Sequence, residues 1–244
     1  MAGCGVPARK ANHNPAPYVQ THLTPIRIDD FKQNDTFITS NYVWKYANIE
    51  WHWELQIPTG LVTYFQNLSR PIVDGFNYSV YIIHSSDDYL INIMASEILK
   101  VSRLHGFSNK ETIEFASSFV QAIPNSPDST TGFDEYPRYP VETLVDITGD
   151  CEDSAILLGS LLQSMGKELV LVSFPDGHYG IGVLGKDCYD TNGRKDDLFG
   201  THWVHNGKKY FYIETTFPNN TIGEIPNLFA HLPVIIYDIP TLPS

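Results

Sequence analysis

The chain has 244 residues, of which 42% are hydrophobic and 13% aromatic, enough for a complete core in one domain or in a domain with a subdomain. Its 28 acidic residues outnumber its 16 basic residues, and the formal net charge of −12 repels nucleic acid and anionic lipid. No stretch has the roughly 20 apolar residues of a membrane-spanning helix, so we expect neither a nucleic-acid partner nor an integral membrane segment.

Residues 1–25 predict an extended leader outside the core, because they contain four prolines and little apolar periodicity. They begin with Met1-Ala2-Gly3-Cys4, which resembles the end of a bacterial or archaeal lipoprotein processing site. The same four residues are equally typical of a chance small-residue start. The first interpretation favours the cell envelope or the extracellular space over the cytoplasm.

Residues 26–244 predict one domain, with an N-terminal helical and aromatic part over 26–135 and a second part over 136–244. The first clear element is EWHWELQIP, residues 50–58, in which apolar and polar residues alternate. A period of two is typical of a half-buried strand. We expect its aromatic face to cover the core, through Trp51, Trp53, Leu55 and Ile57.

Two helices follow this strand. Apolar residues recur at helical spacing from Asp87 to Leu104, and Gly106 is a suitable C-terminal stop. The next helix begins at Ser108, whose spacing to Glu111 predicts a capping box, and it continues to Pro124. Both apolar stripes indicate core helices rather than a functional site.

A third helix and a group of short strands occupy the second part of the chain. The helix begins near Cys151 and ends at Gly166, and it is the most apolar helix of the sequence, so we expect it to be central. The strands are predicted over 168–174, 178–184, 209–216 and 232–239. Helices followed by strands predict an α+β fold in which the cysteine helix packs on a mostly antiparallel sheet.

Cys151 is predicted to lie in the first turn of that helix, because Asp150 or Thr148 is a good N-cap residue and Gly149 permits a tight entry. The helix dipole and the free N–H groups favour a thiolate there. The carboxylates at positions 150, 152 and 153 oppose it. A reactive thiolate therefore requires a cationic partner, and an imidazolium is the natural one.

His178 is the histidine best placed for that partnership, because it opens a predicted strand in which Gly180 and Gly182 share its face. Two glycines leave room there for a helix terminus or a substrate backbone. The alternative is a histidine that only caps the turn after Pro175-Asp176-Gly177.

Glu214 is the candidate for orienting the imidazole. It stands near the end of YFYIETT, where an ionised carboxylate among aromatic and β-branched residues requires a partner. Strand alternation places it on one face with Tyr210 and Tyr212. The alternative is an edge-strand carboxylate that faces solvent.

These segments resemble the transglutaminase-like superfamily of papain-type thiol enzymes, in particular its prokaryotic and archaeal protease-like branch. The resemblance rests on TLVDITGDCEDSAILLGSLLQSMG, then GHYGIGV, then YFYIETT, and covers about residues 136–226. It implies a papain-like core in which Cys151 is the nucleophile, His178 the general base and acid, and Glu214 the orienting residue. Many members have aspartate in a D-x-T setting where this chain has Glu214-Thr215-Thr216.

The resemblance implies thiol-dependent acyl transfer on amide bonds of a protein or peptide, either as a peptidase or amidase or as a cross-linking transglutaminase. Animal transglutaminases support the oxyanion with a tryptophan that has no evident counterpart beside Cys151. Gln121 and Asp150 are the candidates for oxyanion or supporting contacts. The alternative function is a catalytically inactive domain of the same fold that binds protein or cell wall.

No metal and no cofactor are expected. Cys151, Glu152 and Asp153 are adjacent on a helix and therefore diverge, whereas ligands on one helix face need a spacing of three or four residues. Cys188 lies in the polar segment GKDCYDTNGRKDD, which predicts an incidental surface thiol. The oligomeric state is left open.

Overall fold

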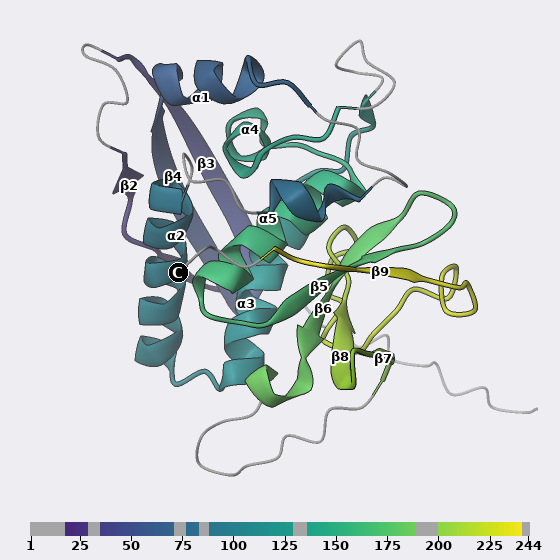
Figure 1. Ribbon diagram of the computed structural model, residues 1–244. Helices are drawn as coiled ribbons and strands as arrows, with labels where there is room; N and C mark the ends of the chain where they lie inside the picture. The colour runs from purple at the N-terminus through teal and green to yellow at the C-terminus, as the bar shows by residue number, and fades with distance from the viewer. Residues whose placement is uncertain are drawn as a thin grey trace, which may run out of the picture.

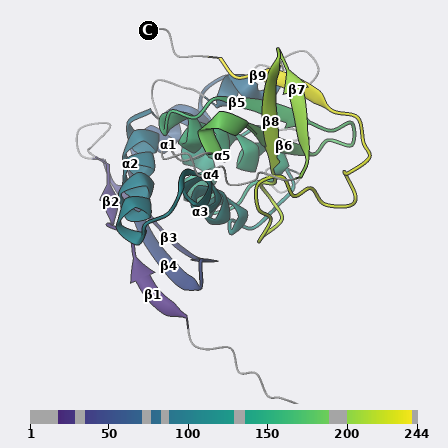
Figure 2. The ribbon, with the colours of Figure 1, turned by 90° about the horizontal axis from the view of Figure 1, so that it is seen from below.

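The computed structural model describes residues 18–28, 35–70, 77–82, 88–128, 136–188 and 200–240. It is an α+β structure, as the order of predicted elements indicated, and it has two sheets where one was predicted. Figure 1 shows α5 in the middle, between the β3–β4 hairpin and the second sheet, and Figure 2 shows α3, α4 and α5 between these two layers.

The first sheet is built around β4 (Ile49–Pro58). This strand pairs in antiparallel fashion with β3 (Phe37–Tyr46) and in parallel with β1 (Val19–His22) and β2 (Ile26–Arg27). A two-residue turn at Ala47 and Asn48 joins β3 to β4, and both residues have positive φ, as a tight hairpin requires. The predicted alternation of β4 is confirmed, since its apolar face is buried at Trp51, Trp53, Leu55 and Ile57.

The leader prediction is wrong for the part of it that the structure describes. Residues 19–22 form β1, and Leu23 is buried in the main core. The backbone N–H of Leu23 donates to the carbonyl oxygen of His52, which extends the pairing of β1 with β4. The prediction gave more weight to the four prolines of residues 1–25 than to the short edge strand that this segment contains. Residues 1–17, with Cys4, lie outside the described residues.

Five α-helices are described, together with the short 3-10 helices η1 (Tyr78–Tyr81) and η3 (Gly185–Cys188). The predicted helices are α2 (Asp88–His105), α3 (Asn109–Gln121) and α5 (Cys151–Ser164). The capping box of α3 is confirmed, with Ser108 and Glu111 bonded in both directions. Two further helices, α1 (Thr59–Gln66) and α4 (Pro140–Asp146), were not predicted.

The second sheet has the order β7-β8-β6-β5-β9, and every neighbouring pair is antiparallel. Its strands are β5 (Leu169–Ser173), β6 (Tyr179–Leu184), β7 (His202–His205), β8 (Lys208–Ile213) and β9 (Ile235–Asp238). Four of them match the predicted strands, and β7 was not predicted. Along β8, Phe211 and Ile213 face the main core, whereas Tyr210 and Tyr212 belong to a second apolar cluster on the other side.

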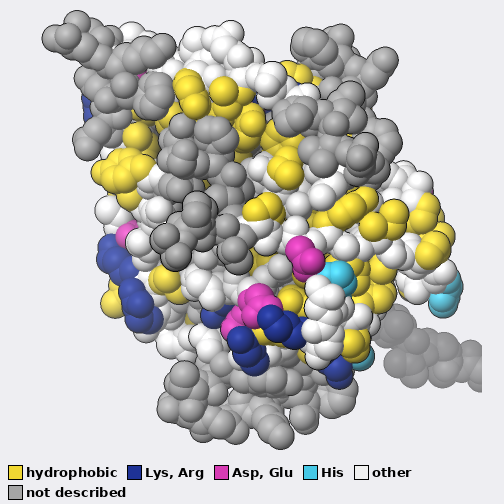
Figure 3. Space-filling view, viewed as in Figure 1, with side chains coloured by type: hydrophobic (Ala, Val, Ile, Leu, Met, Phe, Trp, Pro, Cys, Tyr) yellow, Lys and Arg dark blue, Asp and Glu magenta, His cyan; other side chains and the backbone are white. Residues whose placement is uncertain are grey.

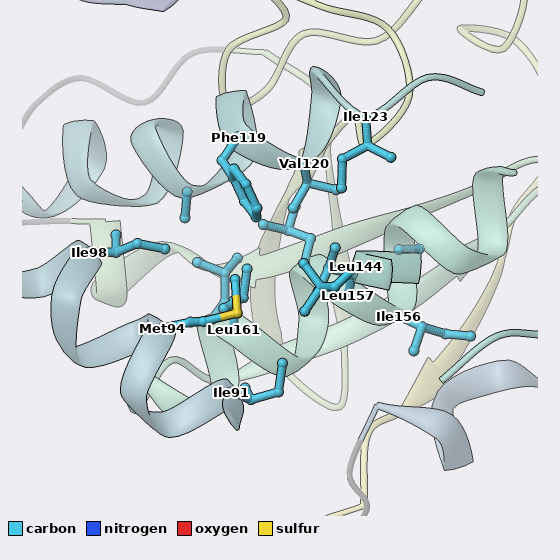
Figure 4. Close-up of a cluster of buried hydrophobic side chains, with 14 of the residues drawn as sticks. Ile91, Met94, Ile98, Phe119, Val120, Ile123, Leu144, Ile156, Leu157 and Leu161 are labelled. Atoms are coloured by element: carbon cyan, nitrogen blue, oxygen red, sulfur yellow. The ribbon is translucent and has the colours of Figure 1, made fainter. Parts of the chain in front are cut away.

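Helix α5 is central, as predicted. It contacts α2, α3, α4, β5 and β6, and its residues from Glu152 to Leu162 are all buried. Figure 4 shows Leu157 and Leu161 of this helix packed with Met94 of α2, Phe119 of α3 and Leu144 of α4. One continuous core thus joins both parts of the chain around the helix that carries Cys151.

Cys188 is not the surface thiol that its polar surroundings predicted. It ends η3, is 0% exposed and belongs to the main core. Burial raises the pKa of its thiol to about 12. Among the residues described, no helix has the length and apolar character needed to cross a bilayer.

Candidate active site

Cys151 is the first residue of α5, and the entry to this helix is built around a buried ion pair. Arg138 donates to Asp153 twice, from its backbone N at 2.6 Å and from Nη1 at 2.5 Å. Both side chains are almost fully buried. A Cβ at Gly149 would lie 2.7 Å from the Cβ of Asp153, so the close packing requires glycine. These contacts place Cys151 firmly at the helix N-terminus.

His178 directly precedes β6, after the turn that contains Asp176 and Gly177. Its carbonyl oxygen accepts from the backbone N–H of Phe174 at 2.8 Å, which closes the turn. The imidazole is buried and stacks on Phe229, with ring centroids 4.0 Å apart and planes 6° apart. The ring therefore has a defined plane.

Glu214 follows β8 and is fully buried, which excludes the solvent-facing alternative. Its Oε2 lies 3.0 Å from Nε2 of His178. Its Oε1 accepts from the backbone N–H groups of Thr215 and Thr216, both at 2.9 Å, and of Phe217 at 3.4 Å. Burial alone would raise the pKa of Glu214, but His178 and the other donors lower it to about 2. The carboxylate is thus ionised at neutral pH.

Tyr212 is a further member of this network, which the sequence did not reveal. Its hydroxyl donates to Oε2 of Glu214 at 2.8 Å and lies 3.3 Å from Nε2 of His178. The phenol is fully buried, and burial together with the Glu214 charge raises its pKa, so it remains protonated. Because an ionised Glu214 accepts from Nε2, the mobile proton of neutral His178 lies on Nε2 and leaves Nδ1 as the acceptor.

The sequence suggested that the two glycines of β6 make room for a helix or a substrate. In the structure, other side chains occupy that space. A Cβ at Gly180 would lie 2.5 Å from the ring of Tyr212, and one at Gly182 would lie 2.6 Å from a methyl group of Val170. The glycine face looks toward the second apolar cluster, away from α5. Gly180 instead leaves space for the ring of Tyr212, whose hydroxyl lies against both Glu214 and His178.

The Cys151 sulfur contacts the backbone on both sides of His178. Sγ donates to the carbonyl oxygen of Gly177 at 3.1 Å, and it accepts from the backbone N–H of Tyr179. Cys151, His178, Thr216 and Phe229 line one pocket of about 560 Å³. The structure therefore brings Cys151, His178 and Glu214 together from α5, the start of β6 and the end of β8.

The thiol does not have the electrostatic setting that the sequence predicted. Burial raises the pKa of Cys151, and the carboxylates of Glu152 and Asp150 raise it further, with Glu152 Oε2 only 3.3 Å from Sγ. Burial and Asp150 also raise the pKa of Glu152 itself. The resting cysteine is thus a neutral thiol rather than half of a thiolate–imidazolium pair.

Gln121 is not in place to bind an oxyanion. Its Nε2 donates to the backbone carbonyl oxygens of Glu214 at 2.8 Å and Asn220 at 3.1 Å, so both amide hydrogens are used. These two bonds hold the loop after β8, and Gln121 lines a different pocket from the one that contains Cys151. Asp150 does line the pocket beside Cys151, as the N-cap residue of α5, but a carboxylate there cannot donate to an oxyanion.

Three acidic residues next to the thiol could offer oxygen ligands. Single oxygens of Asp128, Asp150 and Glu152 lie within 4.8 Å of one another. Arg138 already donates to Asp128 at 3.3 Å, and Oε2 of Glu152 lies 3.3 Å from Sγ of Cys151. These partners account for two of the three carboxylates, and we assign no metal to the cluster.

Comparisons with protein-family models and with curated protein sequences find no match to this chain.

Proposed function

We propose that this protein is a thiol-dependent acyltransferase of the transglutaminase-like, papain-type class, acting on amide bonds of a peptide or protein. The observation that carries the proposal is the position of Cys151 Sγ, in contact with the backbone of Gly177 and Tyr179 on either side of His178. The second support is the buried pair of His178 and Glu214 behind it. A helix on an antiparallel sheet is the arrangement that the resemblance implies.

The reaction would begin with transfer of the Cys151 proton to Nδ1 of His178, followed by attack of the thiolate on an amide carbonyl carbon. Backbone N–H groups in the first turn of α5 are suited to stabilise the resulting oxyanion. Collapse of this intermediate breaks the C–N bond, and His178 returns the proton to the leaving amine. A thioester remains on Cys151.

Release completes the cycle without any cofactor. In hydrolysis, His178 takes a proton from water, and the hydroxyl oxygen bonds to the thioester carbon. The C–S bond then breaks, and His178 returns the proton to the sulfur to regenerate the Cys151 thiol. In cross-linking, an amine takes the place of water. Glu214 and Tyr212 hold the imidazole in the tautomer that both steps need, since they occupy Nε2.

A second function is favoured by one observation. Burial and two neighbouring carboxylates raise the pKa of Cys151, which is unfavourable for a nucleophile at neutral pH. A domain that keeps this fold only to bind protein or cell wall would tolerate that setting. The two functions differ in whether His178 increases the reactivity of the thiol.

Alkylation with iodoacetamide at pH 6 to 7, followed by peptide mapping, separates the two functions. We expect Cys151 to react faster than Cys188, which is fully buried. We also expect His178→Ala to slow Cys151 by about tenfold or more, because the general base is lost. His22→Ala is the matched control, since His22 is exposed on β1 in the other sheet.

Equal rates for Cys151 in the wild type and in folded His178→Ala would favour the binding domain. Turnover of any peptide amide by the wild type, lost in Cys151→Ala, would establish the enzyme. Circular dichroism and thermal unfolding show whether each variant is folded.

A further inference from the structure

The pocket in front of Cys151 has two chemically different sides. One side is apolar and consists of Phe217, Leu228 and Phe229. The other carries the carboxylates of Asp150 and Asp176. Among the described residues that line it, none is a lysine or an arginine. A ligand that fills it must therefore match an apolar surface and a negative one at the same time.

Two of the three apolar side chains are exposed to solvent, although large hydrophobic side chains are usually buried. Leu228 is 72% exposed and Phe217 is 44% exposed, although both border a pocket that contains a buried imidazole. Phe217 and Phe229 lie 6.3 Å apart, and Phe229 covers one face of His178. A large apolar side chain placed here would remove these surfaces from water beside the reacting atoms.

The exposed apolar surface continues beyond the pocket along the same segment. Leu232, which follows Phe229, and Ile235, the first residue of β9, are also exposed. Figure 3 shows hydrophobic side chains gathered where Figure 1 draws β9 and the loop before it. An extended peptide could therefore continue along this loop from the pocket, which favours a polypeptide over a small amide.

The acidic side selects by charge. Asp176 is exposed in the turn just before His178, and Asp150 is half-buried at the N-terminus of α5. With a formal net charge of −12 behind them, these carboxylates attract a basic side chain and repel an acidic one. No lysine or arginine among the described residues that line the pocket opposes this selection.

We propose that the Cys151 site selects polypeptide segments in which a large apolar residue and a lysine or arginine flank the scissile amide. The apolar side chain rests on Phe217, Leu228 and Phe229, and the basic side chain faces Asp176 and Asp150. The inference depends on the proposed acyl transfer, because it assigns that reaction its substrate class.

Fluorogenic peptide amides test it on the full chain. One set varies a leucine next to the cleaved bond to alanine, and the other varies the basic residue from lysine to glutamine and glutamate. We expect kcat/KM to fall about tenfold or more for the loss of leucine. We expect about threefold for glutamine and about tenfold for glutamate, and only these charge effects should shrink in 0.5 M salt.

Two variants link the preferences to the two sides. Leu228→Ser should remove most of the preference for leucine. Leu104→Ser is the matched control and should not, since Leu104 is similarly exposed, at 75%, but lies on α2 and does not line the pocket. Asp176→Asn should reduce the preference for lysine over glutamate, whereas Asp238→Asn on β9 should leave it unchanged.

The outcomes separate this inference from the function on which it rests. If no peptide is cleaved and iodoacetamide reacts with Cys151 at the same rate without His178, the proposed function fails. If peptides are cleaved but leucine, lysine and glutamate are accepted equally, or if the two pocket variants leave the preferences intact, only the substrate class is overturned.

Discussion

Two buried glutamates contact the candidate site, one at the histidine and one at the cysteine, and their surroundings drive their pKa values in opposite directions. Glu214, behind His178, is surrounded by donors, from the backbone of residues 215–217 and from the Tyr212 hydroxyl. Glu152, beside Cys151, faces the carboxylate of Asp150 and the thiol. The pKa of Glu214 is lowered to about 2, and that of Glu152 is raised.

The comparison shows that burial by itself does not decide the charge of a carboxyl group here. On the histidine side the donors lower the pKa of Glu214 in spite of burial, whereas on the cysteine side burial and the Asp150 carboxylate together raise the pKa of Glu152. The histidine side is therefore organised in advance for proton transfer, whereas the cysteine side keeps its proton until a base removes it. Substitutions on one side can therefore be made while the other side is left intact.

The largest effect is expected from removing the Glu214 carboxylate. Glu214→Ala should lower kcat/KM on the order of 10- to 1000-fold, because the imidazole loses its orienting partner and three backbone N–H groups lose their acceptor. Glu214→Gln should retain more activity. Glu214→Asp should not rescue fully, since a displacement of ~1 Å can cost ~100-fold. A folded alanine variant with wild-type kinetics would show that Glu214 is structural.

The second prediction concerns acid unfolding. The pKa of Glu214 falls from 4.5 to about 2 on folding, so its ionised form stabilises the fold above pH 5, and that contribution is lost as the pH falls toward 2. The difference is worth on the order of 3 kcal/mol. Urea unfolding of the wild type from pH 7 to pH 3 should show the decline, and Glu214→Gln should show a flatter curve. Parallel curves would contradict the lowered pKa.

The third prediction concerns Tyr212. Tyr212→Phe removes one hydroxyl that bonds both His178 and Glu214, so kcat should fall about 3- to 10-fold with little change in KM. The acidic limb of the pH–rate profile should also move, which a purely structural role would not cause. Gly180→Ala should reproduce part of this effect, because its Cβ would displace the tyrosine ring.

The smallest effect is expected on the cysteine side, and it has the opposite sign. Asp150→Asn removes a carboxylate that raises the pKa of Cys151 and keeps a good N-cap residue, so the pKa of Cys151 should fall and its alkylation at pH 7 should accelerate about 2- to 5-fold. Glu168→Gln, on an exposed carboxylate that pairs with Lys208, is the control. A slower reaction in Asp150→Asn would mean that Asp150 assists the thiol.

The elements that bear the candidate triad could be predicted because each has a local signal. Gly149 and Asp150 mark the start of α5, the turn at Gly177 precedes β6, and alternation along β8 places Glu214 on the side of Tyr212. The capping box at Ser108 is equally local. Such signals depend on neighbours in the sequence, so they are visible without the fold.

What could not be predicted depends on contacts between distant segments. Gly180 has no side chain where the ring of Tyr212 packs, and Tyr212 stands 32 positions further along the chain. Cys188 is buried although its neighbours in the sequence are polar. Leu23 enters the core only because β1 pairs with β4. The predicted role of Gln121 failed for the same reason, since its partners are the backbone of Glu214 and Asn220.

The parallel stack of His178 on Phe229, with centroids 4.0 Å apart, also gives the site a spectroscopic signature. Protons on the imidazole carbons lie over the face of the phenylalanine, where its ring current shields them, so their NMR resonances should be displaced upfield from those of the exposed histidines. One well-resolved imidazole signal would then report directly on ring orientation and on proton exchange at Nδ1. The feature that immobilises the base thus makes it observable in the intact protein.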